Sequence, residues 1–399
     1  MLQFFSASTN IVNSKRAITE CLENALEGQP NLDCDLIIIY TAMGHNFKDL
    51  LSEARRLSFG ARIAGCTGGG IIGRKRPDES MTALAIMVIK GPQNEFAMVN
   101  RRTKMGIDPF LVAAEMAREL KNKNPNISLI QFLPNIFEWF PIDKAVEGIK
   151  SVFGPGIPIF GAVSMDNFKA INSYHFFDDQ VVERGAVMIG YGDPTLKFIS
   201  QANHGFNIVE GKSFEVTRSE SNCIQELNGK PVWKELTETL GLPETAQPLE
   251  VVAIACFAKE LPEELQEEYG SKYLLFAIGG KNKDNSIITN ITCPIGMKIW
   301  LTKRNEEKMF NGADLMMKKI LDTLQENKPL AVFHADCVLR GRFSLNRILK
   351  DELINHLQFP ICGGENVPWL GLYSGGEFAM IGGQTWYHNI TSSLFVIYR

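Results

Sequence analysis

The hydrophobic pattern of the chain repeats one order of predicted elements three times. Each copy has an amphipathic helix, a buried strand, a polar loop, a second helix, a short strand ending in glycine, and a further strand. In the first copy, apolar residues at intervals of three and four predict a helix over 18–26, and residues 36–40 form a continuous apolar run. A helix over 47–57, the segment ARIAG at 61–65 and an apolar strand over 81–89 complete it.

The second and third copies follow the same order with different residues. The second has a helix face over 110–120, a strand over 127–133, a helix over 143–153, the segment IPIFG at 157–161 and a strand over 186–191. The third has a helix over 309–324, a strand over 330–333, a helix over 345–357, the segment FPICG at 359–363 and a strand over 392–398. The spacing from buried strand to glycine agrees within a few residues, which indicates an internal repeat.

The chain between the second and third copies has a different pattern, rich in hairpin signals. Asn228-Gly229 is a preferred two-residue turn, and Pro231 suits the first turn of a helix over 231–240. Strands are predicted over 251–257, 273–279, 287–291 and 298–302. The whole pattern predicts an α/β fold of mixed sheets flanked by helices. We expect two lobes, an N-terminal domain over 1–220 and a C-terminal domain over 221–399.

Charge and composition exclude several classes of protein. With 41 Lys and Arg against 45 Asp and Glu, the net charge of −4 provides no basic field for nucleic acid or an anionic membrane. The longest apolar stretch, 127–140, is too short and too interrupted for a membrane helix, and residues 1–15 do not resemble a secretory signal. Eight widely spaced cysteines, with no CxxC pair, are typical of reduced thiols in a cytoplasmic protein.

Two groups of residues resemble a nucleotide-binding motif and a catalytic pair, but both have simpler interpretations. Residues 68–73, GGGIIG, match a GxGxxG pattern, but Arg74, Arg76 and Pro77 follow where a dinucleotide site requires a helix. We therefore interpret this segment as a glycine-rich turn. Cys337 or Ser374 with His334 or His388 would supply a nucleophile and a base, yet no nucleophile elbow accompanies them. The sequence favours a protein that is not an enzyme.

The third copy carries a more persuasive ligand site. HADCVLRGR places Arg340 just past a buried strand, and GLYSGGEF places Glu377 after two glycines. A guanidinium group binds a carboxylate through two hydrogen bonds and a carboxylate receives an ammonium group, so the pair suits an amino-acid-like ligand. An Arg340–Glu377 ion pair that locks the loop explains the same residues equally well. His388 and Asn389 are either ligand contacts or partners of turn backbone.

An ordered set of motifs resembles the FIST sensory domain family. The set comprises CDLIIIYTAMG, IAGCTGGGIIG, IPIFGAVSMD, YHFFDD, GAVMIGY, FEVTRSESNCIQELNGKPVWKELTETLG, HADCVLRGR, GLYSGGEFAMIG and HNITSSLFVI. The resemblance implies an intracellular sensor of small molecules such as amino acids. It also implies a stand-alone bacterial type whose signal passes to a separate histidine kinase or cyclic-di-GMP enzyme.

Within that family, the chain looks like the nitric-oxide-sensing haemoproteins (NosP-like). The segments that carry this resemblance are DCVLRG, the later GE and HNIT. This resemblance implies a haem whose axial ligand is usually a histidine, and the candidates are His204, His334 and His388. His175 belongs to a motif general to the family.

The predicted ligand site also includes side chains of the glycine loops near residues 65–73, 161–166 and 363–377. It comprises Arg340, Glu377, Asp166, Thr67, Ser164 and Asn389. A ligand signals only if it favours one arrangement of these loops. Nitric oxide on haem is the leading ligand hypothesis, with a haem-free metabolite sensor and a hydrolase-like enzyme as alternatives.

Overall fold

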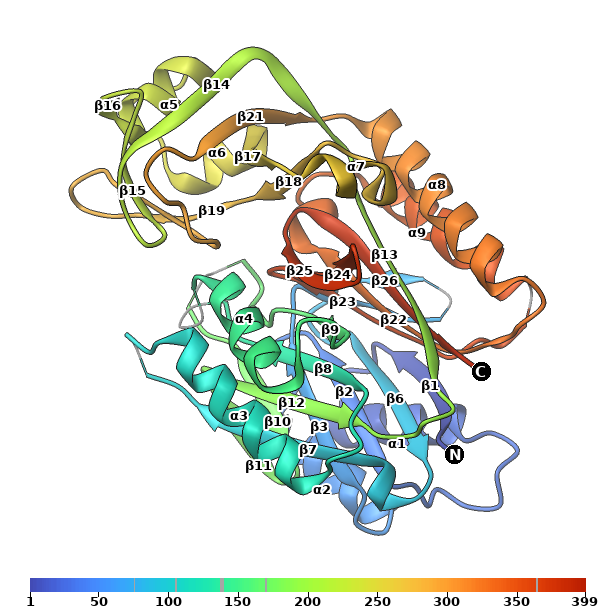
Figure 1. The fold of residues 1–399 in the computed structure, drawn as a ribbon. Coiled ribbons are helices and arrows are strands. Elements are labelled where there is room, and N and C mark those ends of the chain that lie inside the picture. The colour runs from blue at the N-terminus through green and yellow to red at the C-terminus, as the bar shows by residue number, and fades with distance from the viewer. Residues whose placement is uncertain (75, 105, 137–139, 169–170, 364) are drawn as a thin grey trace.

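The computed structural model describes residues 1–399 except 75, 105, 137–139, 169–170 and 364. It confirms the predicted α/β fold of mixed sheets flanked by helices in two lobes (Figure 1). Within the described residues, no helix combines the length and apolar character that crossing a membrane requires.

The larger lobe contains the three predicted copies, here called units 1, 2 and 3. Unit 1 comprises β1 (Gln3–Thr9), α1 (Ser14–Ala25), β2 (Leu36–Thr41), α2 (Phe47–Leu57), β3 (Arg62–Thr67), β4 (Gly70–Ile72), β5 (Pro77–Asp78) and β6 (Leu84–Lys90). Unit 2 comprises β7 (Phe96–Arg102), α3 (Pro109–Lys123), β8 (Leu129–Pro134), α4 (Ile142–Phe153), β9 (Ile159–Gly161), β10 (Tyr174–Phe177), β11 (Gln180–Glu183) and β12 (Gly185–Tyr191). Unit 3 comprises β13 (Lys197–His204), α8 (Glu306–Leu324), β22 (Pro329–Cys337), α9 (Arg347–Cys362), β23 (Trp369–Ser374), β24 (Glu377–Ile381), β25 (Gln384–His388) and β26 (Thr391–Tyr398).

The strand order confirms the internal repeat. The three units pair their strands as β1-β6-β2-β3, β7-β12-β8-β9 and β13-β26-β22-β23. In each unit the last pair is parallel and the other two pairs are antiparallel. Each unit also begins with a strand, β1, β7 or β13, that the predicted repeat did not include, and this strand lies at one end of the strand order of its sheet.

The short strand of unit 3 was predicted in the wrong place. FPICG does not form a strand, because α9 continues through Pro360 to Cys362 and Gly363 closes it in a left-handed conformation. The short strand is β23, and its glycine is Gly371. A short apolar run that ends in glycine has the same pattern in a strand and in a last helical turn.

The hairpin of each unit leaves its own sheet and contacts another unit. The β4–β5 hairpin of unit 1 pairs with β23 of unit 3, and the β10–β11 hairpin of unit 2 pairs with β3 of unit 1. The β24–β25 hairpin of unit 3 meets unit 2 through a bridge between Glu377 and Ala162. The exchange is therefore cyclic, and it brings the loops after β3, β9 and β23 together.

Backbone hydrogen bonds join these three loops directly. The amide of Met165 donates to the carbonyl of Thr67 over 3.1 Å. The amide of Gly69 donates to the carbonyl of Tyr373 over 2.9 Å. The amide of Gly375 donates to the carbonyl of Val163 over 2.9 Å. The predicted glycine loops thus form one hydrogen-bonded centre.

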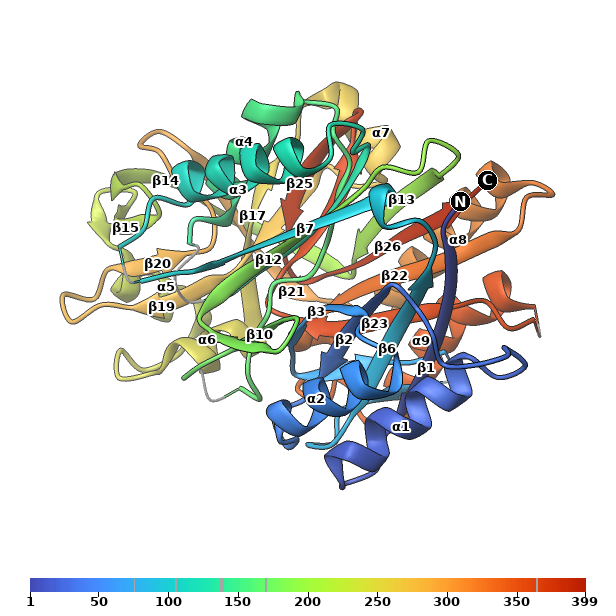
Figure 2. The same cartoon turned by 90° about the horizontal axis from the view of Figure 1, so that it is seen from below.

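An apolar core lies where the inner faces of the three sheets meet. Phe160 of unit 2 stacks on Phe395 of unit 3, with ring centroids 4.1 Å apart. Gln131 spans the core by donating to the hydroxyl of Tyr40 and accepting from that of Tyr191. The outer faces pack against each unit's own helices, which gives the layers seen in Figure 2. Continuous apolar runs in the central strands fit this burial on both faces.

The smaller lobe is an insertion into unit 3, between β13 and α8. It comprises β14 (Phe206–Glu220), β15 (Cys223–Leu227), β16 (Lys230–Pro231), α5 (Val232–Leu240), α6 (Pro248–Ile254), β17 (Ala255–Glu260), α7 (Glu263–Tyr269), β18 (Tyr273–Phe276), β19 (Ile278–Lys281), β20 (Ile287–Thr289) and β21 (Lys298–Arg304). Its strands run in the order β18-β17-β21-β14-β15-β20-β19. The lobes are therefore residues 206–304 and the rest of the described chain, whereas the sequence placed their division near residue 220.

One element of this lobe differs in type from its prediction. Residues 251–254, expected to begin a strand, end helix α6. Gln247 and Glu250 form a reciprocal capping box and Pro248 occupies the first turn, so these residues start a helix before the apolar run begins. The strand itself, β17, starts at Ala255.

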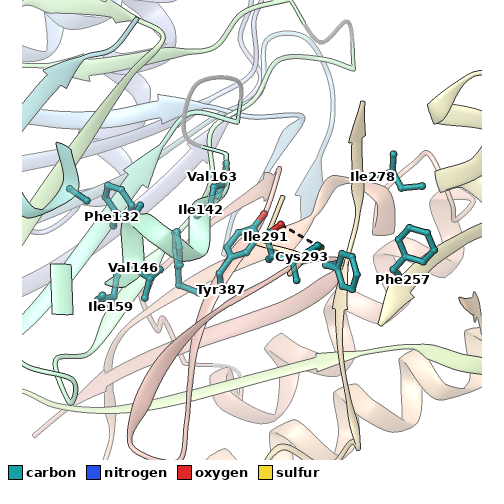
Figure 3. Close-up of a cluster of buried hydrophobic side chains, with 14 of the residues drawn as sticks. Phe132, Ile142, Val146, Ile159, Val163, Phe257, Ile278, Ile291, Cys293 and Tyr387 are labelled. Atoms are coloured by element: carbon teal, nitrogen blue, oxygen red, sulfur yellow. Dashed lines mark hydrogen bonds between the residues drawn. The ribbon is translucent and has the colours of Figure 1, made fainter. Parts of the chain in front are cut away.

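An apolar cluster joins the two lobes. Phe132, Val146 and Ile159 of unit 2 belong to the same cluster as Phe257 and Ile291 of the insertion (Figure 3). The lobes are thus in continuous apolar contact on this side of the molecule.

The glycine that ends β9 provides a test of the repeat. Gly161 has a φ of +128°, and a Cβ there would lie 2.2 Å from the carbonyl oxygen of Phe132 on the parallel neighbour. We expect Gly161→Ala to lower the free energy of unfolding by about 4 kcal/mol or more, measured by urea denaturation. Gly154→Ala is the matched control, because its φ is +99° with open space around it, and it should cost about 1–2 kcal/mol. Equal costs for both variants would contradict this assignment.

Candidate functional site

A cavity of about 670 Å³ lies between the insertion and the centre of the larger lobe. One wall comes from α6 and from β19 with its flanking residues, and includes Leu249, Val252 and Ile278. The opposite wall comes from loops of units 2 and 3. The residues of this wall include Phe140, Met165, Asp166, Phe168, Cys337, Val338, Leu339, Gly375 and Asn389. Its volume lies in the range of pockets that bind small molecules.

A buried ion pair holds the unit 3 part of this wall. Cys337, Val338 and Leu339 form a tight turn between Asp336 and Arg340, whose side chains meet with Nε 2.8 Å from Oδ1. Burial would raise the pKa of Asp336, but the Arg340 guanidinium and His334 hold it below its usual value. Removing one partner of such a pair typically costs about 3–5 kcal/mol, since the other charge remains buried.

The predicted ion pair between Arg340 and Glu377 is not formed. Arg340 pairs with Asp336 instead, and Glu377 accepts hydrogen bonds from the hydroxyls of Ser374 and Thr391, each over 2.9 Å. Burial raises the pKa of Glu377 well above its usual value, which favours the uncharged acid. Neither residue lines the cavity, so the pair does not form a binding site for an amino acid there.

Asp166 and Asn389 are the predicted ligand residues that do line the cavity. Asp166 Oδ2 accepts from the backbone amides of residues 171 and 172. Asn389 Nδ2 donates to the carbonyl of Gly375 over 2.9 Å and to the hydroxyl of Tyr387 over 3.2 Å. Its Oδ1 has no hydrogen-bond partner among the described residues.

Thr67 and Ser164 lie behind the cavity and hold its loops. The Thr67 hydroxyl donates to the carbonyl of Met165 over 3.0 Å. The Ser164 hydroxyl lies 2.9 Å from Nε2 of His175 and 3.0 Å from the hydroxyl of Ser173. Both side chains are completely buried, so they position the loops and do not face a ligand in the cavity.

The comparisons with known proteins identify the family. A model of the FIST N domain matches residues 35–230, and a model of the FIST C domain matches residues 231–380. The chain belongs to the FIST family. FIST domains are sensory domains that bind small ligands, so the predicted family and its sensory character are confirmed. The resemblance to haem-based nitric oxide sensors stays a prediction.

Solved structures resemble the FIST protein only distantly. They include cyanuric acid hydrolase from A. caulinodans, with 9% identity, a TM-score of 0.37 and coverage of 100% of this chain and 99% of that chain. A chorismatase has 8% identity, a TM-score of 0.37 and the same coverage. PurL of T. maritima with AMPPCP has 9% identity, a TM-score of 0.23 and coverage of 100% and 72%. No curated protein matches the sequence.

The three histidines predicted as haem ligands do not line the cavity of the FIST protein. His204 uses both ring nitrogens, with Nε2 2.8 Å from the hydroxyl of Ser271 and Nδ1 accepting from the amide of Phe206. His334 contacts the hydroxyl of Ser392 over 2.8 Å, and His388 lies 3.5 Å from that of Tyr269. The described residues therefore do not fit a histidine-ligated haem in this cavity.

Among the described lining residues, Cys337 is the candidate for a thiolate ligand of haem. Cys337 lines the cavity, but burial raises the pKa of its thiol well above the usual value and favours the protonated form. Haem binding elsewhere in the protein stays a prediction.

The wall supplied by the insertion was missed by sequence analysis. Gln247, Leu249, Val252 and residues 277–280 line the cavity, but none belongs to a motif that suggests binding. The signal that was available is the pair Gln247-Pro248 before an apolar segment, which indicates a helix start. The sequence does not show which face of the larger lobe that helix covers, because this depends on tertiary packing.

His204 predicts how the stability of the FIST protein depends on pH. Burial, followed by the nearby charges of Arg340 and Lys308, lowers the pKa of His204 from 6.5 to about 4. Below pH 6.5 the unfolded chain therefore takes up a proton that the folded chain does not, and stability falls as the pH drops toward 4. We expect His204→Gln to reduce the slope of unfolding free energy against pH by about 1.4 kcal/mol per pH unit between pH 4.5 and 6.

The measurement is urea unfolding at several pH values. His356→Gln is the control, because His356 on α9 is partly exposed and pairs with Asp314 of α8. An unchanged slope in His204→Gln would contradict a neutral His204 in the folded protein.

Proposed function

We propose that this FIST protein is a sensor that holds a small, uncharged and largely apolar ligand between its two lobes. The observation that carries the proposal is the composition of the cavity. Most of its described lining is apolar, with aromatic side chains at Phe140 and Phe168. Among the described lining residues there is no Lys, Arg or His.

This lining favours the haem-free metabolite hypothesis but changes the class of ligand. An amino acid carries a carboxylate that needs a cationic or multiple N–H partner when it leaves water. The described lining supplies the carboxylate of Asp166 and the amides of asparagine and glutamine, with Arg340 engaged elsewhere. An uncharged ligand with few polar groups loses less hydration there.

The position of the cavity supports a sensory role. Its walls come from different lobes, so a bound ligand contacts both α6 of the insertion and the hydrogen-bonded centre of the three units. A ligand that contacts one arrangement of these walls better than another shifts their equilibrium. We infer that this shift is reported to a separate partner, such as a histidine kinase or cyclic-di-GMP enzyme, in the cytoplasm.

We also infer that the protein binds rather than catalyses. The protonated thiol of Cys337 has a poorly activated sulfur, and no described histidine lines the cavity beside it to act as a base. Ser374, the other proposed nucleophile, is completely buried and donates to Glu377. We therefore interpret Cys337 and Ser374 as structural residues.

Nile red, an uncharged apolar fluorophore, provides a direct test. We expect saturable one-to-one binding with enhanced fluorescence, because the probe enters an apolar cavity. Leu249→Glu should raise its Kd about tenfold by placing a charge at the cavity wall. Ile254→Glu is the matched control, since both residues are on α6 and are 48% and 40% exposed, but Ile254 does not line the cavity. Equal Kd values in both variants, or no saturable binding, would refute the proposed site.

The haem hypothesis has a separate test. We expect that adding haem to the purified protein produces no saturable Soret band, because His204, His334 and His388 do not line the cavity and each has a protein hydroxyl beside one ring nitrogen. The measurement is an absorption titration with haem, followed by nitric oxide under reducing conditions. A one-to-one Soret band that shifts with nitric oxide and is lost in one histidine variant would replace our proposal with the haem sensor.

A further inference from the structure

One phenol hydroxyl joins the two walls of the cavity. Tyr387, 4% exposed, accepts hydrogen bonds from Nδ2 of Asn290 over 3.0 Å and from Nδ2 of Asn389 over 3.2 Å. Its own hydrogen points to the carbonyl of Gly375, 3.4 Å away. Asn290 follows β20 of the insertion and Asn389 follows β25 of unit 3, and both line the cavity.

The hydrogen bonds fix which way each amide faces. Asn389 Nδ2 donates to the carbonyl of Gly375 and to Tyr387, so both of its hydrogens are used. The opposite orientation would place Oδ1 against that carbonyl oxygen. Asn290 Oδ1 accepts from the amide of Ala277 over 3.1 Å, which likewise fixes its amide.

An inventory of donors and acceptors then shows what is left. A side-chain amide has two N–H donors and one oxygen acceptor. Asn389 retains its acceptor, since Oδ1 has no partner among the described residues. Asn290 retains one N–H, since Nδ2 has Tyr387 as its single described partner. A buried amide acceptor without a partner costs free energy, so a ligand that supplies the donor is favoured.

We propose that the ligand carries a cis-amide group, as in a lactam, whose N–H donates to Asn389 Oδ1 and whose carbonyl accepts from Asn290. This inference rests on the proposed function and names the ligand class for the same cavity. Both Nδ2 atoms lie within hydrogen-bond distance of one phenol oxygen, so the two amides are close enough for one small group to bind both. The rest of the ligand lies against apolar residues, including Phe140 and Phe168.

Asn389 and Asn290 are therefore specificity-determining residues, and Tyr387 positions them. The Tyr387 ring packs against Phe378, with centroids 5.9 Å apart, inside the apolar cluster that joins the lobes. Burial raises the pKa of its hydroxyl well above the usual value, so it keeps the proton that it donates to Gly375.

Two probes that differ by one methyl group test the inference. 2-Quinolinone presents an N–H next to a carbonyl, and 1-methyl-2-quinolinone lacks the N–H. We expect the first to bind the unmodified protein about tenfold more tightly by titration calorimetry, because the methylated probe leaves Asn389 Oδ1 unpaired. This comparison needs no variant and so does not depend on how substitutions affect folding.

Two variants then assign the difference to Asn389. Asn389→Leu should bring the two affinities within about twofold of each other, because it removes the acceptor. Asn222→Leu is the matched control, since Asn222 also lines the cavity but its Nδ2 donates to the carbonyl of Thr289. It should keep the full difference. Thermal unfolding of each variant confirms that it is folded.

The outcomes separate this inference from the proposed function. Equal affinities for the two probes, or no binding of either, in a protein that binds Nile red saturably would overturn the cis-amide inference and leave the apolar cavity in place. Failure of Nile red and both probes would overturn both. A difference that persists in Asn389→Leu would show that another residue reads the N–H.

Discussion

The cyclic exchange of hairpins is the constraint on which the rest of the structure depends. Each unit sends the hairpin after its short parallel strand to another unit, through strand pairing for units 1 and 2 and through a single bridge for unit 3, so the three loops meet at one place. Glycines in the short strands permit this exchange, because they leave room for the backbone of the neighbouring strand. A Cβ on Gly65 would lie 2.0 Å from the carbonyl of Ile39, and one on Gly161 would lie 2.2 Å from that of Phe132. The loops after β9 and β23 also line the cavity, so the repeat and this wall of the site have one physical origin.

The meeting of the loops also explains why polar side chains are buried at the centre. Units 2 and 3 place a serine three residues after the glycine of the short strand, and the serine contacts a side chain of its own hairpin: Ser164 with His175, and Ser374 with Glu377. Buried polar groups need such partners. Histidine and serine in these positions resemble catalytic pairs in sequence, but their burial and contacts suit loops held in fixed conformations.

The sequence predicted the repeated units well because their signals are local. Apolar periodicity located the helices and central strands, and the family resemblance rested on motifs in order. The sequence could not distinguish a helix end from a strand at FPICG, since both are short apolar runs before glycine. It also could not choose the partner of Arg340. Asp336 and Glu377 are both acidic residues of unit 3, and the choice depends on a tight turn that puts Asp336 four residues before Arg340.

The insertion was the least predictable part of the site, although it supplies half of the cavity wall. Most of its lining residues are apolar or glycine, and its polar ones, such as Asn290, belong to no binding motif. Its placement on unit 2 depends on the shared apolar cluster, which a single sequence does not reveal. That cluster restricts how the protein responds to a ligand. Rotation of whole lobes would expose buried side chains such as Phe257 and Ile291, whereas a shift of short α6 and the glycine loops leaves them packed. A local rearrangement of the cavity walls is therefore the response that costs least.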